Sequence, residues 1–143
     1  MDKSVRINDF EDVKSQIIRM VAVNYIVAQY AAAQVETTES CVKTSEALEK
    51  LAINQQKAGV ADGLDVLRAK VQLANDRQNL LVVKNSYEKT LLVLARSIGM
   101  DMGTPLALAD KLAFKRFNAP QIEQAVNAAL ENRPDYRSLF AQK

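Results

Sequence analysis

The first 58 residues of the chain contain neither glycine nor proline, and this absence constrains the fold more than any other feature. All four glycines and all three prolines of the 143 residues lie at or beyond Gly59. Most residues of the segment favour helix, and none of them breaks one. We therefore predict one helix from about Asp9 to Ala58, which would be about 75 Å long at the usual helical rise.

The apolar residues of this first segment recur at steps of three and four, which is typical of a coiled-coil seam. The predicted stripe consists of Val13, Ile17, Val21, Ala28, Ala31, Val35, Thr38, Val42 and Leu48. Between Val21 and Val27 the helix would be apolar on nearly every side. Such a segment requires neighbours all round, which one partner helix cannot supply.

A second helix is predicted to follow after a very short turn. Gly59 can adopt the left-handed conformation that ends a helix. Asp62 can serve as the N-cap of the next helix, and Asp65 can serve as the first-turn acid of a capping box. A turn this short makes the two helices antiparallel neighbours. The second helix would run to about Ile98, with an apolar stripe of Leu67, Val71, Ala74, Leu81, Leu91, Leu94 and Ile98, and with Leu80, Val83 and Tyr87 alongside.

The periodicity is lost from Met100 to Asn118. Residues 104–117 are predicted to be extended or irregular, with packing anchors at Leu106, Leu108, Leu112 and Phe114. A short helix from about Ala119 to Asn132 has Pro120 in its first turn, and a further helix starts at residues 133–135. The predicted fold class is all-α: a long antiparallel two-helix coiled-coil hairpin, a short irregular segment, and one or two short C-terminal helices.

The composition argues against an enzyme. There is no histidine, which is the commonest general base and metal ligand. Cys41 is the only cysteine, so it cannot form an internal disulfide, and we expect a small, half-buried residue. Glu46 and Glu49 share their helix with lysines, which is typical of a solvated face rather than a catalytic carboxylate pair. We expect no catalytic residue, no metal site and no cofactor.

Charge and hydropathy exclude two further classes. The 19 basic and 17 acidic residues alternate along the chain and give a net charge of +2, so we expect no nucleic-acid partner. The most apolar stretch, from Ile17 to Val35, includes Arg19 and several amides, which argues against a membrane span. The first residues, Met1 to Arg6, do not resemble a signal peptide. If the parent protein is exported, we expect this chain to be a segment of it.

Three segments resemble one family. Residues 58–69 read Ala-Gly-Val-Ala-Asp-Gly-Leu-Asp-Val-Leu-Arg-Ala, followed by Val-Gln-Leu-Ala at 71–74. This resembles the hairpin tip of TolC-type outer membrane efflux proteins. Residues 87–99 are similar to the end of the family's returning helix. Residues 128–139, Ala-Ala-Leu-Glu-Asn-Arg-Pro-Asp-Tyr-Arg-Ser-Leu, resemble the segment that leads into its next helix.

The resemblance implies a function in transport. The chain would form part of the periplasmic helical tunnel of an outer-membrane efflux or secretion channel, and the full-length parent would be a homotrimer. The hairpin tip would dock a periplasmic adaptor protein and, through it, an inner-membrane pump. Residues 1–143 would be one periplasmic helical domain, with the hairpin at about 9–98 and an equatorial-type segment at about 99–143. Any membrane contact would involve only parts of the parent that are absent here.

The resemblance also assigns site residues. Those that match the partner-binding tip are Gly59, Val60, Ala61, Leu64 and Leu67. Asp65 matches an aspartate near the constricted periplasmic mouth in relatives, where acidic groups bind cations and keep the entrance closed. Simpler roles also explain two of these residues, because Gly59 can serve as a plain helix stop and a first-turn acid such as Asp65 is stabilised by the helix N-terminus; for Gly59 both roles can hold together.

Two alternative readings remain open. Periplasmic adaptor (membrane fusion) proteins also contain a two-helix coiled coil with a glycine near its turn, although β-rich segments flank that hairpin. A generic coiled-coil interaction module would have the same helices and no role for the Gly-Val tip.

Overall fold

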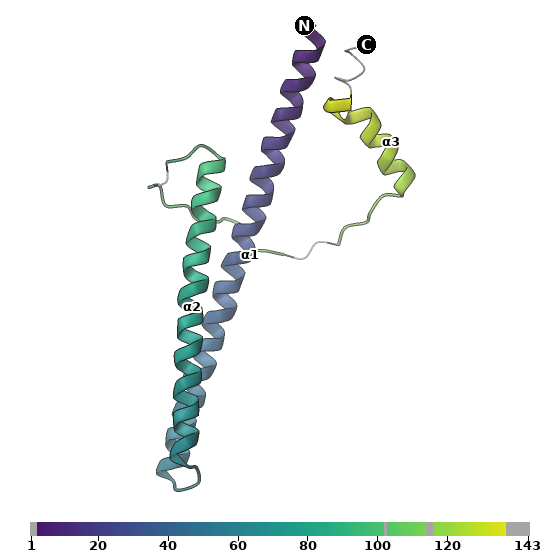
Figure 1. The fold of residues 1–143 in the computed structure, drawn as a ribbon. Coiled ribbons are helices and arrows are strands. Elements are labelled where there is room, and N and C mark those ends of the chain that lie inside the picture. The colour runs from purple at the N-terminus through teal and green to yellow at the C-terminus, as the bar shows by residue number, and fades with distance from the viewer. Residues whose placement is uncertain (1–2, 102, 114–115, 137–143) are drawn as a thin grey trace. The chain divides into compact units, whose positions relative to one another are not determined.

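A computed structural model describes residues 3–101, 103–113 and 116–136. It contains three helices: α1 (Lys3–Lys57), α2 (Gly63–Ser97) and α3 (Ile122–Asn132) (Figure 1). The described residues form no strand. The chain divides into two compact units, residues 24–112 and residues 1–23 with 113–143. The all-α fold class is confirmed, and α1 begins earlier than the predicted Asp9.

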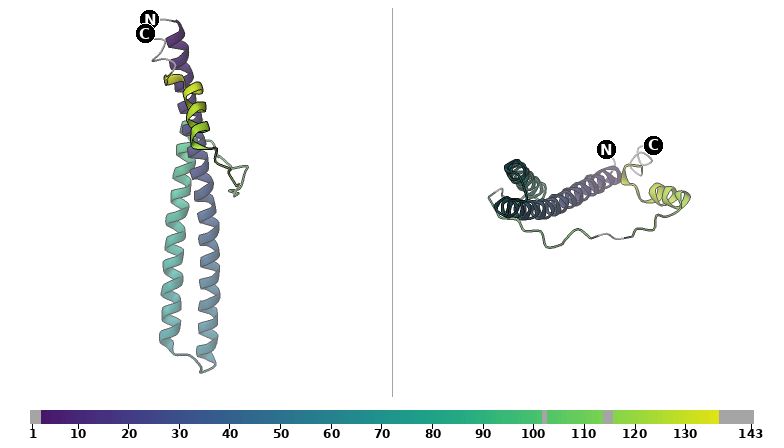
Figure 2. Two further views of the ribbon diagram at one scale, coloured as in Figure 1. Left: turned by 90° about the vertical axis from the view of Figure 1, so that its right-hand side faces the viewer. Right: turned by 90° about the horizontal axis from the view of Figure 1, so that it is seen from below.

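The unit of residues 24–112 is an antiparallel hairpin in which α1 and α2 lie side by side (Figures 1 and 2). Its seam consists of residues that are buried or half-buried at alternating steps of three and four. On α1 these are Ala28, Ala31, Val35, Thr38, Val42, Ser45, Glu49 and Ala52; on α2 they are Val66, Ala69, Leu73, Asp76, Leu80, Val83, Tyr87, Thr90 and Leu94. A strict seven-residue repeat is the pattern of a left-handed coiled coil. The predicted coiled-coil hairpin is therefore confirmed.

The two helices contribute differently to this seam. The α1 side consists mostly of small residues such as Ala28 and Ala31, whereas the α2 side carries large ones such as Leu73 and Leu94. Small residues on one helix leave holes for the large knobs of its partner. Leu73 retains only 3% of its accessible surface, so the knobs of α2 fill the holes of α1.

Polar contacts fix which residues lie level across the seam. Lys84 Nζ lies 2.8 Å from a carboxylate oxygen of Glu39. Arg77 donates a 2.9 Å hydrogen bond to Glu46. Ser45 donates a hydrogen bond to Asp76 next to the second of these ion pairs. Glu39 thus meets Lys84, whereas Ser45 and Glu46, further along α1, meet residues 76–77, which come earlier in α2; together the contacts define a single antiparallel register for the hairpin.

The predicted stripe is wrong for much of α2. Leu67, Val71 and Leu81 are exposed, and the seam instead uses the neighbouring Val66 and Leu80. Apolar doublets such as 66–67 and 80–81 allow two apolar stripes along α2. Only the stripe that includes Val66 and Leu80 continues in seven-residue steps through Tyr87 and Leu94. On α1, Val13, Ile17 and Leu48 are likewise exposed.

Cys41 is exposed, contrary to the half-buried position expected for it. Its neighbour Val42 occupies the seam. Adjacent helical residues point about 100° apart, because a turn holds 3.6 of them. The thiol therefore lies outside the seam.

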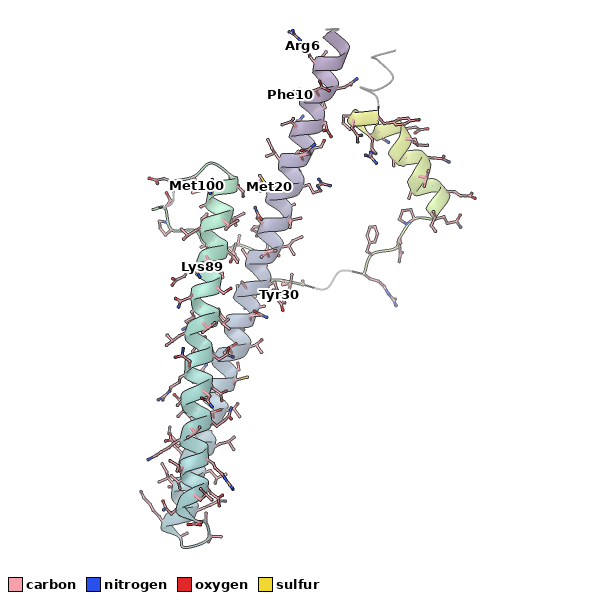
Figure 3. The ribbon with its side chains drawn as sticks, viewed as in Figure 1. Arg6, Phe10, Met20, Tyr30, Lys89 and Met100 are labelled. Carbon is pink, nitrogen blue, oxygen red and sulfur yellow. The ribbon has the colours of Figure 1, made fainter. Side chains whose placement is uncertain are left out.

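Residues 104–112 form an extended segment, here called the strap, that follows α2 and crosses α1. Tyr25 Oη donates a 3.1 Å hydrogen bond to the Asp110 carboxylate, and Gln29 Nε2 donates a 3.2 Å bond to the Asp110 carbonyl. Leu112 lines the same shallow hollow as Tyr30, the residue labelled on α1 in Figure 3. Of the predicted anchors, Leu106 and Leu108 are half-buried, Leu112 is exposed, and Phe114 lies outside the described residues.

The other unit contains α3. Its apolar residues Ile122, Val126 and Leu130 are all exposed. The helix starts at Ile122 rather than at the predicted Ala119, so Pro120 precedes it. Arg133 Nε donates a 3.1 Å hydrogen bond to Asp135, and helix resumes at residues 134–136, as predicted.

Candidate functional site: the hairpin tip

The turn between α1 and α2 is a glycine-dependent helix stop. Gly59 has a φ of +73°, in the left-handed region that favours glycine. The Val60 N–H donates a 2.9 Å hydrogen bond to the Gln55 carbonyl, and the Gly59 N–H donates a 3.0 Å bond to the Gln56 carbonyl. This pair of bonds is the Schellman motif. The predicted role of Gly59 in ending the first helix is confirmed.

The same motif ends α2. Gly99 also has a φ of +73°, and the Met100 N–H bonds the Ala95 carbonyl at 2.9 Å. At both glycines a Cβ would meet no atom within 4 Å, so only the backbone conformation requires glycine. Gly99 therefore provides a matched comparison for Gly59 at a position away from the tip.

The start of α2 differs in detail from the predicted capping box. Asp62 occupies the N-cap with extended backbone angles, as predicted, but its side chain makes no capping hydrogen bond. Asp65 instead pairs with Arg68 one turn along, at 3.5 Å. Both side chains are more than half exposed, and exposed pairs of this kind contribute little to stability. The Asp65 carboxylate is thus accessible but has a basic neighbour.

The tip presents apolar side chains to solvent. Val60 is 79% exposed, and Leu64 and Leu67 are about half exposed on the first turns of α2. Ala61 is half-buried. Val66 turns inward to begin the seam, which leaves Leu64 and Leu67 on the outer side. All five predicted tip residues thus lie at one end of the hairpin, where the side chains of Val60, Leu64 and Leu67 form an exposed apolar surface.

The acidic residues of the described part of the chain do not gather into a candidate metal site. Across residues 3–101, 103–113 and 116–136, no three His, Cys, Asp or Glu side chains are grouped so that they could hold a metal ion. In the same ranges, no helix has both the length and the hydrophobicity needed to span a bilayer.

A family model for outer membrane efflux proteins matches residues 5–100 of the chain, which include all of α2 and nearly all of α1. The chain belongs to the outer membrane efflux protein family. The resemblance noted from the tip sequence is thereby confirmed. Comparisons with curated proteins and with solved structures gave no match. As a member of this family, the chain is a component of an outer-membrane efflux channel.

Sequence reasoning missed two features of the hairpin. The Ser45–Asp76 contact was not foreseen, because a serine and an aspartate in helical runs are ordinary surface residues until the register is known. The second feature is that Val71, Ala74 and Leu81, which were predicted to belong to the packed stripe, lie on the outside of α2. The doublets Val66-Leu67 and Leu80-Leu81 were its visible signal, since one member of each doublet must face away from the seam.

Proposed function

We propose that the chain forms part of the periplasmic helical tunnel of an efflux channel and docks a periplasmic adaptor through its hairpin tip. The docking surface consists of Gly59, Val60, Ala61, Leu64 and Leu67. Through the adaptor the channel connects to an inner-membrane pump.

The exposed apolar tip is the observation that carries this proposal. A valine that is 79% exposed at the end of a hairpin, next to two half-exposed leucines, has no packing role in the hairpin itself. Surfaces of this kind mark contacts with other proteins. Gly59 supports the surface, because the Schellman turn holds Val60 at the outermost position.

We further propose that the full-length protein is a homotrimer. Ile26 and Val27 are exposed on α1, within the stretch that is apolar on nearly every side. A single partner helix leaves these side chains in water, and additional subunits would cover them. Asp65 is proposed to contribute negative charge at the periplasmic entrance, where its exposed carboxylate could meet a cation or a basic group of another subunit.

Substitutions at the tip of the full-length protein test the docking surface. Gly59→Ala and Leu64→Asp should abolish export while the protein still reaches the outer membrane, because they alter the tip and leave the seam intact. Export is read as survival on compounds to which loss of the gene sensitises the cells. Gly99→Ala is the matched control, since it introduces the same backbone strain away from the tip. Unchanged export in both tip variants would contradict the proposal.

A further inference from the structure

The two broad faces of the hairpin differ in charge. From residue 30 to 57, every charged residue of α1 lies either in the seam or on one side of it, and the same is true of α2 from residue 70 to 88. The two ion pairs across the seam show that both helices use the same side. We call this side the charged face. It includes Glu36, Glu39, Lys43, Glu46 and Lys50 of α1, and Lys70, Arg77, Lys84 and Glu88 of α2.

The opposite face carries no charge over the same length. Its exposed residues on α1 are Gln34, Thr37, Cys41, Thr44, Leu48 and Leu51. Those on α2 are Gln72, Asn75, Asn79, Val82 and Ser86. Because Gln34, Thr37 and Asn79 line one hollow, these positions of the two helices share a face. We call this side the uncharged face; amides and hydroxyls predominate on it.

The contrast between the two faces indicates two different environments. A protein surface in bulk water normally carries charged residues of both signs, as the charged face does. The uncharged face is also exposed but lacks such residues along the middle of the hairpin. In a tunnel wall, one broad face is turned to the periplasm and the other to the conduit. The charged face has the composition expected of the side in bulk solvent.

The strap is attached to α1 on the charged side. Tyr25 and Gln29, which donate the hydrogen bonds to the strap, occupy the same positions of the seven-residue repeat as Glu39 and Glu36. A segment attached to the inner wall of a tunnel would narrow the conduit, so the strap favours the charged side as the outer one. The last residue of the strap, Leu112, lines the hollow on the uncharged face.

We infer that the uncharged face lines the conduit, and that this stretch of the wall does not select cargo by charge. The inference rests on the proposed tunnel and adds to it the orientation of the hairpin. Charges of one sign along a narrow passage with low-dielectric walls concentrate counter-ions and repel ions of their own sign. A wall of amides, hydroxyls and apolar side chains does neither, so solutes of either charge pass it alike.

The hollow on the uncharged face indicates the kind of solute that this wall contacts. It is open, has a volume of about 460 Å³, and is lined by Tyr30, Val83 and Leu112 together with the polar Gln34, Thr37 and Asn79. Gln34 donates a 2.8 Å hydrogen bond to the Tyr30 hydroxyl. Aromatic and aliphatic groups beside a few neutral polar ones suit a ligand with an apolar body. The expected cargo class is therefore amphiphilic solutes, contacted through apolar surface and neutral hydrogen bonds.

The native Cys41 provides the test, because its exposed thiol lies on the uncharged face. The full-length protein is reconstituted in planar lipid bilayers and treated with a cationic or an anionic methanethiosulfonate reagent. Each reagent places one charge per subunit in the conduit, so the two should shift the reversal potential in a salt gradient in opposite directions. The control is Lys43→Cys in a Cys41→Ser background. This thiol lies on the charged face, where the same reagents should cause no shift.

Three outcomes would overturn the inference: modification of Cys41, verified by mass spectrometry, without a shift; a shift of equal size in the Lys43→Cys variant; or a Cys41 thiol that stays unmodified in the conducting channel. Absence of any conducting channel would instead contradict the proposed tunnel itself. An adaptor adduct from Val60, together with channels that modification of Cys41 leaves unchanged, would leave the proposed function standing and remove only the orientation of the hairpin.

Discussion

The hydroxyl of Ser45 on α1 donates a hydrogen bond to the carboxylate of Asp76 on α2, in the middle of an otherwise largely apolar seam. Ser45 is buried, and Asp76 also accepts a 3.0 Å bond from Gln72. A polar pair inside a coiled coil is satisfied in one register only, so it specifies pairing at some cost in stability.

Replacing Ser45 should therefore destabilise the hairpin. We expect Ser45→Ala to lower the free energy of unfolding by about 1 kcal/mol, because Asp76 loses a partner in a partly dehydrated position. Urea unfolding of the chain, followed by far-UV circular dichroism, measures this change. The double variant Ser45→Ala/Asp76→Leu should be at least as stable as the native chain. If the double variant has a lower free energy of unfolding than Ser45→Ala, the pair stabilises the hairpin and does not merely specify its register.

Two leucines on opposite sides of α2 should respond very differently to truncation. Leu73→Ala should cost about 2–4 kcal/mol, because this side chain is almost fully buried in the seam. Leu81→Ala should change the free energy of unfolding of the isolated chain by less than about 0.5 kcal/mol, because that side chain lies largely in water. Equal effects in urea unfolding would mean that the seam is misassigned.

Gly59 and Gly99 should be equally sensitive to alanine in the isolated chain. Each Gly→Ala change should cost about 1–2 kcal/mol, because a Cβ is unfavourable at a φ of +73° although space for it is available. Gly59→Asn should cost less, since asparagine tolerates the left-handed region. Thermal unfolding of the three variants measures these effects. If Gly59→Ala leaves the thermal stability unchanged, the left-handed conformation of Gly59 in the Schellman turn is contradicted.

Acidification should weaken the hairpin through Glu39 and Glu46. The hydrogen bond and charge of Lys84 lower the pKa of Glu39 below its ordinary value of 4.5, and the hydrogen bond from Arg77 does the same for Glu46. Their contribution is fully present above pH 4.5 and is lost as the pH falls through the lowered pKa values. Both groups are exposed, so the effect should be small and weaker at high salt.

The comparison for this effect is the double variant Glu39→Gln/Glu46→Gln. Its melting temperature should fall less steeply than that of the native chain when the pH is lowered past 4.5. Parallel curves for the two proteins would show that these ion pairs do not contribute.

The sequence was sufficient to predict most of the fold. The absence of glycine and proline before Gly59 predicted a single α1, and residues 59–65 predicted both the helix stop and the N-cap position at Asp62. These predictions succeeded because local backbone chemistry determines them. The tip residues could be named from the same segment by family resemblance.

The seam of α2 could not be chosen from the sequence. Both Leu80 and Leu81 fit an apolar stripe by periodicity, and the choice depends on which of them meets the small residues of the facing helix. The strap was unpredictable for a related reason. The contacts of Asp110 with Tyr25 and Gln29 join residues far apart in the chain, and no local pattern marks them.

The most direct test of the docking site is crosslinking from single cysteines at Val60 and Ala61. The full-length protein carries Cys41→Ser, because the native thiol is exposed, and is expressed in cells with its adaptor. We expect a thiol crosslinker to join each tip position to a periplasmic adaptor, and a cysteine at the exposed Lys50 to give no adduct. Absence of an adaptor adduct from both tip positions, in protein correctly placed in the outer membrane, would contradict docking at the tip.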